Sequence, residues 1–303
     1  MPLQHGWTKR GGSFARALRA LGIAATLLCS MGATADGLHT FWEISGKHNT
    51  VWLFGAVHVL HSSDTSLPQV ATNAYGNAEK VVEELVIDEV LGELAGPEGQ
   101  KLQFLPEGQT LPAVLGPDLY SKLQAEAQRL GIDLEFMSRM QPWFVAQQVE
   151  SLRMLRAGFN PLNGVDMQIA ARARQDGKPV LGLETLNDQL GIFAGLSMDE
   201  QRDFLRATLE ETESEAELRE LTKAWRDGDL KTLQSALRKG AEESPVLFRK
   251  LTVDRNRRWI PQIEQMLQDQ GNDYLIVTGA LHMVGRDGLV ELLRRKGYKV
   301  VQK

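Results

Sequence analysis

Two histidines stand in the same short sequence pattern near opposite ends of the chain. Residues 55–58 read GAVH and residues 279–282 read GALH, so His58 and His282 each close a Gly-Ala-X-His segment. Each segment follows an apolar run, 51–54 or 274–277, whose length and composition predict a buried strand. Ligands bind at the carboxyl ends of strands in open α/β sheets. We therefore expect both histidines to face one site.

Two adjacent glutamates interrupt a third apolar run, residues 81–87, which we also predict to be a strand. Neighbouring strand residues point to opposite faces, so Glu83 and Glu84 are not expected to share a site through this strand. If the sheet is covered on both faces, at least one of the two carboxylates is buried and needs a partner. A metal ion or a cationic side chain would supply it, and an edge strand with one glutamate in water is the alternative.

Four other polar side chains are weaker candidates. Arg255 lies in an apolar i, i+4 series, so it either extends outward to solvent or is held inward against an anion. Glu184 ends a predicted strand at 178–183 and either reaches the same crevice or opens the next helix. Asp166 is expected to be a helix N-cap rather than a ligand. His61 lies in a Ser- and Asp-rich loop, and we expect no role for it.

Several common catalytic motifs are missing from the sequence. It has no G-x-S-x-G elbow, no H-E-x-x-H motif and no glycine-rich phosphate loop. Its single cysteine, Cys29, lies near the amino terminus, in an apolar stretch. Serine, cysteine and zincin-type mechanisms in their usual forms are therefore disfavoured.

The helices and strands that must position these residues are predicted from the spacing of apolar residues and from the capping, Gly and Pro residues at element ends. We predict strands at 51–54, 81–87, 178–183, 273–278 and 298–301, and a loop at 92–109. Helices are predicted at 68–79, 117–130, 142–157, 166–176, 244–270 and 287–296, and Ser197 to Glu200 read as a capping box that opens another helix. The prediction is a single α/β domain over residues 36–303, with a helical insertion over roughly 111–261.

The first 35 residues are predicted to be a secretory signal peptide. They carry four basic residues and no acid, an apolar segment at 18–31 and an Ala-Thr-Ala cleavage pattern at 33–35. Loss of this segment would make the formal net charge of −5 more negative and leave no cysteine. We expect a periplasmic protein without a stable membrane anchor, and an acidic surface that repels nucleic acid. A peptide or small molecule is the expected substrate, and the oligomeric state stays open.

The chain resembles the TraB/GumN or Tiki-like family over nearly all of its predicted mature length. The resemblance rests on seven segments in order: GAVH at 55–58, VEEL at 82–85, QPW at 141–143, GVD at 164–166, GLET at 182–185, RN at 255–256, and GALH at 279–282 followed by VGRDG at 284–288. The G-x-x-H signatures of the family fall on His58 and His282, its strand glutamate falls on Glu84, and its arginine falls on Arg255. Family members often carry Asp two places after that glutamate, where this chain has Val86.

The resemblance implies a Tiki, erythromycin-esterase and ChaN-like fold and three hypotheses for function. The first is a metal-dependent hydrolase in which His58, Glu84 and His282 bind Mn²⁺, Co²⁺ or Zn²⁺ and Arg255 stabilises an oxyanion. The second is a metal-independent esterase-type hydrolase with a histidine as general base, oriented by Glu84. The third is a periplasmic module that binds haem or another ligand through one histidine.

Overall fold

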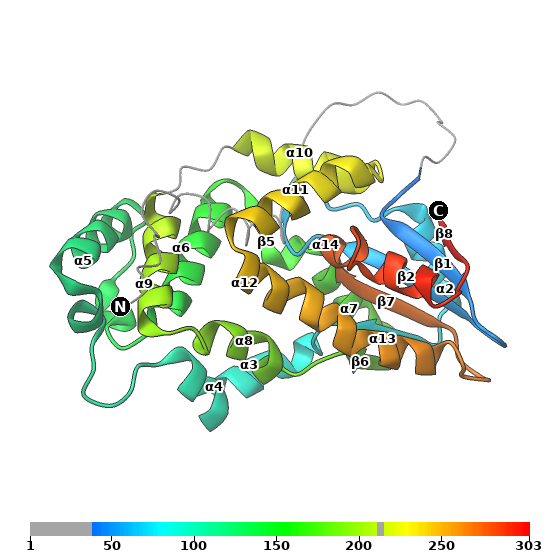
Figure 1. Ribbon diagram of the computed structural model, residues 1–303, viewed down its shortest axis with the longest axis horizontal. Coiled ribbons are helices and arrows are strands. Elements are labelled where there is room, and N and C mark those ends of the chain that lie inside the picture. Colours follow the sequence, from blue (N-terminus) through cyan, green and yellow to red (C-terminus); the bar gives the residue numbers. More distant parts are fainter. Residues whose placement is uncertain (1–37, 211–214) are drawn as a thin grey trace, which may run out of the picture.

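The structure is a computed structural model that describes residues 38–210 and 215–303. The predicted signal peptide, residues 1–35, lies outside the described residues. A central sheet with helices on both faces occupies one half of the molecule, and a lobe of helices occupies the other half (Figure 1). Across the described ranges, no helix has both the length and the apolar character needed to cross a membrane.

The sheet has six strands in the order β6-β4-β7-β2-β1-β8. Strands β6, β4, β7 and β2 are mutually parallel neighbours, whereas β1 pairs antiparallel with both β2 and β8. The bounds are β1 Phe41–Ser45, β2 Thr50–Ala56, β4 Lys80–Glu83, β6 Val180–Gly182, β7 Tyr274–Gly279 and β8 Val300–Gln302. The short strands β3 Leu60–His61 and β5 Phe159–Asn160 form a separate antiparallel pair. The carboxyl ends of four adjacent strands thus meet at one edge.

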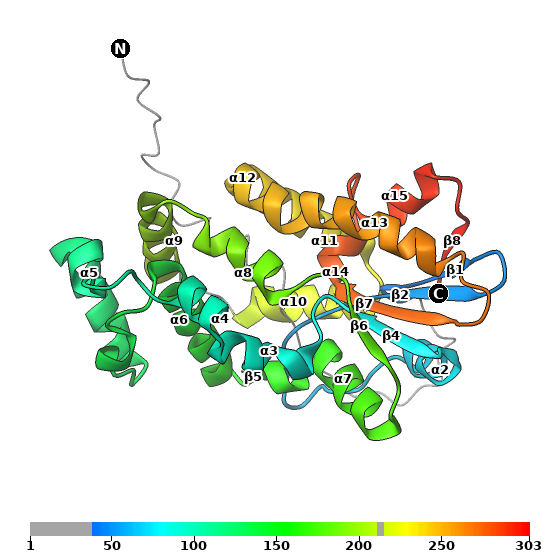
Figure 2. The ribbon, with the colours of Figure 1, turned by 90° about the horizontal axis from the view of Figure 1, so that it is seen from below.

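Both faces of the sheet are buried, because alternate strand residues enter two separate cores. Ile276 belongs to one core and its neighbours Leu275 and Val277 to the other, as the period of two in a strand requires. Figure 2 shows α13 and α15 on one side of the sheet and α2 and α7 on the other. These helices are α2 Gln69–Asn77, α7 Val165–Asp176, α13 Asp254–Met266 and α15 Leu289–Arg295. Such two-sided covering explains why the parallel strands are continuously apolar.

The helical lobe has an apolar core of its own, in which aromatic rings stack. The ring of Phe193 lies between those of Trp143 and Phe204, with centroid distances of 5.5 and 6.1 Å. The helices of the lobe and its connections are α3 Ile87–Ala95, α4 Pro97–Gln103, α5 Leu111–Arg129, α6 Pro142–Arg156, α8 Leu186–Ala194, α9 Met198–Glu210, α10 Glu215–Arg226, α11 Leu230–Glu243 and α12 Pro245–Phe248. A π-helical turn, Arg249–Val253, joins α12 to α13. A mixed sheet and many helices confirm the predicted α/β class.

Most of the predicted elements are present, with ends that differ from the predicted ones by a few residues. The predicted capping box is confirmed, since Ser197 and Glu200 exchange side-chain to backbone hydrogen bonds. Gly131, Gly158 and Gly177 follow helices with positive φ, as expected for left-handed C-caps.

Two expectations were wrong, and one strand was missed. The predicted strand 81–87 ends at Glu83, and α3 begins at Ile87. The predicted loop 92–109 contains the end of α3 and all of α4, because Pro97 occupies the first helical position of α4, where a proline is favourable. Strand β1 was not predicted. It lies close to the amino-terminal edge of the described chain and adds the only antiparallel strand next to β2 among the described residues.

Candidate functional site

Four polar residues follow the carboxyl ends of the four adjacent parallel strands. Glu184 comes after β6, Glu84 after β4, His58 after β2, and His282 lies in the short helix α14, Ala280–Met283, which follows β7. These residues are far apart in the sequence, from His58 to His282. They meet because the strands that they follow are neighbours in the sheet. The two histidines predicted to face one site do so, with Glu84 between them.

His58 is the more exposed of the two histidines and is paired with a carboxylate. Its Nδ1 lies 3.0 Å from Oδ2 of Asp166, its Nε2 lies 3.9 Å from Oε1 of Glu84, and its side chain is 36% exposed. Burial lowers the pKa of His58, but Asp166, with Glu84, outweighs it and raises the pKa to about 9. His58 therefore holds a proton at neutral pH.

Asp166 is a partner of His58 rather than a helix N-cap, which corrects the sequence prediction. The N-cap of α7 is Gly164, and Asp166 stands in the first turn of the helix. The Gly164 backbone approaches the His58 carbonyl so closely that a Cβ there would lie 2.4 Å from that oxygen. This close approach brings the start of α7 against the segment that carries His58.

His282 is buried and its hydrogen bonds fix one neutral tautomer. Its Nδ1 donates to Oδ1 of Asn256 at 2.6 Å, and its Nε2 accepts from Nη1 of Arg255 at 3.2 Å. The ring of Trp259 packs against it at a centroid distance of 4.6 Å. Burial and the Arg255 guanidinium lower the pKa of His282 to about 3. His282 is therefore neutral throughout the physiological range of pH.

Glu84 accepts hydrogen bonds on both carboxylate oxygens. Oε1 accepts the backbone N–H of Gly279 at 2.7 Å, and Oε2 accepts from Arg255 and from Nε2 of Gln189. Burial alone would raise the pKa of Glu84, but the Arg255 guanidinium, with smaller effects of the two histidines and of the Gly279 N–H, holds it well below its usual range. Glu84 is a carboxylate at every pH at which the protein would function.

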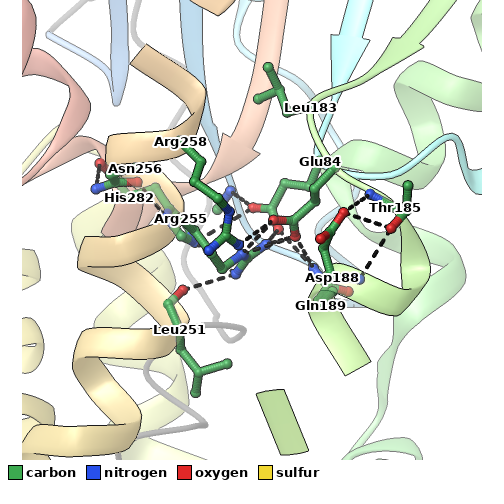
Figure 3. A network of polar contacts seen from close by, with 12 residues as sticks. Glu84, Leu183, Thr185, Asp188, Gln189, Leu251, Arg255, Asn256, Arg258 and His282 are labelled. Atoms are coloured by element: carbon green, nitrogen blue, oxygen red, sulfur yellow. Dashed lines mark hydrogen bonds and ion pairs between the residues drawn. The ribbon is translucent and has the colours of Figure 1, made fainter. Parts of the chain in front are cut away.

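Arg255 is held inward at the centre of this network, which settles the question that the sequence left open (Figure 3). Its Nε and Nη2 donate to Glu184, Nη2 also donates to Glu84, and Nη1 donates to the Leu251 carbonyl and to His282. These contacts use all five N–H groups of the guanidinium. As placed, Arg255 has no donor left for a substrate oxyanion, so it positions Glu84 instead. Glu184 reaches the same crevice through this ion pair.

Glu83 and Glu84 both line the cavity at the strand ends. Their charged neighbours come from opposite sides of the sheet, as the strand alternation predicts: Asp166 of α7 acts on Glu83, and Arg255 of α13 pairs with Glu84. Glu83 is 1% exposed, and neither carboxylate oxygen has a partner in hydrogen-bond geometry, although the Ile87 N–H lies close enough to lower its pKa slightly. Burial, with the Asp166 charge, raises the pKa of Glu83 to about 8.

His61 lies outside this cluster, as expected. Its Nδ1 contacts the Ser63 hydroxyl at 2.7 Å, and its ring packs against Phe159 at a centroid distance of 5.4 Å. Gln189 was not a candidate from the sequence, and Asn256 was marked only as part of the RN segment at 255–256. Their contacts with His282 and Glu84 depend on residues 26 and 105 positions away in the chain.

The donor atoms around Glu84 suit a first-row divalent ion in type and spacing. The Nε2 atoms of His58 and His282 each lie 3.9 Å from Oε1 of Glu84. Two donors that bind one ion at about 2.1 Å each can be at most about 4.2 Å apart. Gly279 opens the space between them, because a Cβ there would lie 3.0 Å from Nε2 of His58 and 3.4 Å from Oε1 of Glu84.

One contact competes with such an ion. Nε2 of His282 already accepts a hydrogen bond from Arg255, so this bond must open before the nitrogen can bind a metal. In the parts of the chain that the structure describes, no three His, Cys, Asp or Glu side chains are already grouped tightly enough to hold a metal ion.

Comparison with known proteins gives the family. The uncharacterized protein YbaP of Shigella flexneri is 24% identical over 276 residues, which cover 88% of this chain and 97% of that protein. YbaP of Escherichia coli (strain K12) is 24% identical over 80% of this chain and 87% of its own length. Metalloprotease TIKI2 of Xenopus tropicalis is 22% identical over 90% of this chain, which spans 61% of that longer protein.

No solved structure gives a significant match to the chain. The family model TraB/PrgY/gumN matches residues 40–302, which is nearly the whole of the described chain. The chain belongs to the TraB/PrgY/gumN family.

Proposed function

We propose that this protein is a metal-dependent hydrolase that cleaves an amide or ester bond. The observation that carries the proposal is the convergence of His58, Glu84 and His282 on Gly279 at the carboxyl edge of the sheet, beside a cavity of about 940 Å³. The similarity to proteins named metalloproteases supports the reaction class. The predicted signal peptide supports a periplasmic location.

The ligand set in this proposal is Nε2 of His58, Oε1 of Glu84 and Nε2 of His282. Two imidazoles and a carboxylate suit Mn²⁺, Co²⁺ or Zn²⁺. A bound divalent ion supplies Lewis acidity and lowers the pKa of a water molecule.

The surrounding residues prepare these three side chains for that role. Asn256 accepts from Nδ1 of His282, which leaves the lone pair on Nε2. Asp166 orients the ring of His58, which must lose the proton that it holds at neutral pH before its Nε2 can bind an ion. Arg255, which is also paired with Glu184, keeps Glu84 ionised and fixes its orientation. The role of Arg255 in the proposal is thus to position Glu84, and a direct contact with an oxyanion would require it to leave His282.

A metal-independent hydrolase is the second candidate, because one observation favours it. The Asp166 carboxylate orients His58 in the way that a carboxylate orients the histidine of an acid–base pair. In this version His58 carries the proton transfer, and Asp166 rather than Glu84 orients it. Its raised pKa suits donation of a proton to a leaving group better than abstraction of one at neutral pH.

A hydrolysis assay with chelator separates the two candidates. A mixed peptide digest and p-nitrophenyl acetate serve as unselective substrates for the purified protein, with and without EDTA and with Mn²⁺, Co²⁺ or Zn²⁺ added back. We expect chelator to abolish turnover and the added ion to restore it. The variants His58→Ala and His282→Ala should be inactive, whereas His61→Ala, a histidine outside the cluster, should match the wild type. Full activity in EDTA would favour the second candidate, and activity in both cluster variants would contradict both candidates.

A further inference from the structure

The cavity beside the strand ends is walled mainly by apolar side chains. Its volume is about 940 Å³, at the upper end of the range for small-molecule sites. It lies between α3, α7, the carboxyl edge of the sheet and the short 3-10 helix Pro161–Asn163. The apolar side chains that line its walls include Leu85, Ile87, Val90, Leu91, Leu162 and Met167.

Helix α3 carries an apolar stripe that the described structure covers only in part, since Ile87, Val90 and Leu94 are half-buried and Leu91 is exposed. Ile87, Val90, Leu91 and Leu94 recur at the i, i+3, i+4, i+7 spacing of a core-facing helix, yet α3 has no buried residue. Leu91 is 79% exposed, and Leu162 from the 3-10 helix is 69% exposed. Two large aliphatic side chains left in water at one cavity indicate a surface that a ligand covers.

Polar side chains are confined to two parts of this cavity. One part is the cluster of His58, Glu84 and Asp166, which Glu83 and Gln189 adjoin. The other is the ion pair between Asp88 of α3 and Arg174 of α7, with Nε of Arg174 2.8 Å from Oδ2 of Asp88. Arg174 follows Asp166 by two helical turns, about 12 Å along α7. A peptide backbone placed between the two parts would find few side-chain partners for its N–H and C=O groups, which is costly. A hydrocarbon chain needs none.

We propose that this cavity binds an aliphatic chain carried on the acyl side of the bond that the protein cleaves. The proposal rests on the proposed hydrolase function. The scissile carbonyl would lie beside His58 and Glu84, and the chain would extend from there along α3 and α7 toward Asp88 and Arg174. An acyl ester and a peptide with a large aliphatic side chain share this chemistry.

Binding can be measured without turnover, with the fluorescent probe N-phenylnaphthylamine. We expect saturable fluorescence enhancement with the wild-type protein. The variants Leu91→Gln and Leu162→Gln should each weaken probe affinity by about fivefold, because each loses apolar contact area. Phe136→Gln is the matched control, since Phe136 is 81% exposed but does not line the cavity. Both leucines are largely exposed, so neither substitution threatens folding. Equal affinity in all four proteins would overturn the proposal.

Hydrolysis identifies the source of the chain. The protein is assayed with p-nitrophenyl acetate and octanoate, and with p-nitroanilides of N-acetyl-leucine and N-acetyl-serine. A preference for octanoate points to acyl esters and a preference for the leucine anilide to peptides, and the preference should fall about fivefold in Leu91→Gln. Turnover with no preference in either pair contradicts the chain-binding role but leaves the hydrolase intact. If probe binding depends on Leu91 but no substrate is turned over, the hydrolase proposal is contradicted, whereas binding of an apolar ligand in the cavity still stands.

Discussion

The two Gly-Ala-X-His segments have nearly the same sequence and opposite electrostatic surroundings. Both follow parallel strands that pair directly, and both place Nε2 at 3.9 Å from the same oxygen of Glu84. His58 has a carboxylate at Nδ1 and a side chain open to the cavity. His282 has an amide oxygen at Nδ1, the Trp259 ring against it and a guanidinium at Nε2.

The charged groups beside each ring and its burial, not the motif, therefore decide the protonation state of each histidine. Asp166 raises the pKa of His58 to about 9 in spite of burial, whereas burial and Arg255 lower the pKa of His282 to about 3. At neutral pH the site combines a proton donor with a neutral imidazole. A symmetric pair of histidines would offer only one of these chemistries at a given pH.

Removal of Arg255 should have the largest effect on the stability of the protein and on the difference between the two histidines. Arg255→Met leaves the carboxylates of Glu84 and Glu184 buried without their cation, which typically costs about 3 to 5 kcal/mol of unfolding free energy. The pKa of His282 should rise as the nearby positive charge is lost. Urea denaturation and NMR titration of the histidine rings measure the two effects. A variant as stable as the wild type would show that the ion pair does not hold the site together.

Substitution of Asn256 changes the hydrogen-bond partner at Nδ1 of the buried His282. Asn256→Ala leaves the Nδ1–H of His282 without an acceptor and should cost about 2 kcal/mol. Asn256→Asp instead gives His282 the kind of partner that His58 has, so the pKa of His282 should move upward from about 3. If NMR titration shows an unchanged His282 in Asn256→Asp, the partner of Nδ1 does not control its pKa.

Glu83→Gln should act in the opposite direction, by stabilising the protein. The pKa of Glu83 is raised on folding to about 8, so the folded state holds this proton more tightly than the unfolded state. The stability of the wild type should then fall as the pH rises from about 4.5 to 8, and a neutral isostere avoids that loss. We expect Glu83→Gln to be more stable by about 1 to 2 kcal/mol at pH 8 and equal to the wild type near pH 4. A loss of stability at pH 8 would mean that the carboxylate has a favourable partner.

Asp166→Asn should have the smallest effect on stability and a clear effect on pH dependence. The raised pKa of His58 contributes stability that is complete below pH 6.5 and is lost as the pH rises from 6.5 through about 9. Both side chains are partly solvated, so the contribution is about 1 kcal/mol or less. In Asp166→Asn the titration midpoint of His58 should fall to its ordinary value or below, and the part of the pH dependence of stability that His58 contributes should disappear, while the part that Glu83 contributes remains. A midpoint that stays near 9 would show that Asp166 does not raise the pKa of His58.

Sequence reasoning located the four parallel strands and the edge of the sheet at which they end, because buried parallel strands are short, apolar and followed by the site residues. It could not assign Asp166, since the contact with His58 joins positions 108 residues apart through the packing of α7. The same limit applies to Arg255, whose inward orientation depends on carboxylates brought in by β4 and β6. Helix α3 was missed because glycines at 92 and 96 read as loop signals and no residue of α3 is buried in a core.

The most direct test of the account is calorimetric titration of Mn²⁺ or Zn²⁺ into the wild type, Glu84→Gln and Glu83→Gln. The two substitutions are adjacent and isosteric, but only Glu84 is ionised and faces both histidine Nε2 atoms. Because Glu83 is largely protonated at pH 7, its replacement should leave metal affinity unchanged. We predict that Glu83→Gln binds the ion as the wild type does and that Glu84→Gln binds it at least tenfold more weakly. Equal affinity in all three proteins would contradict a metal site built on Glu84.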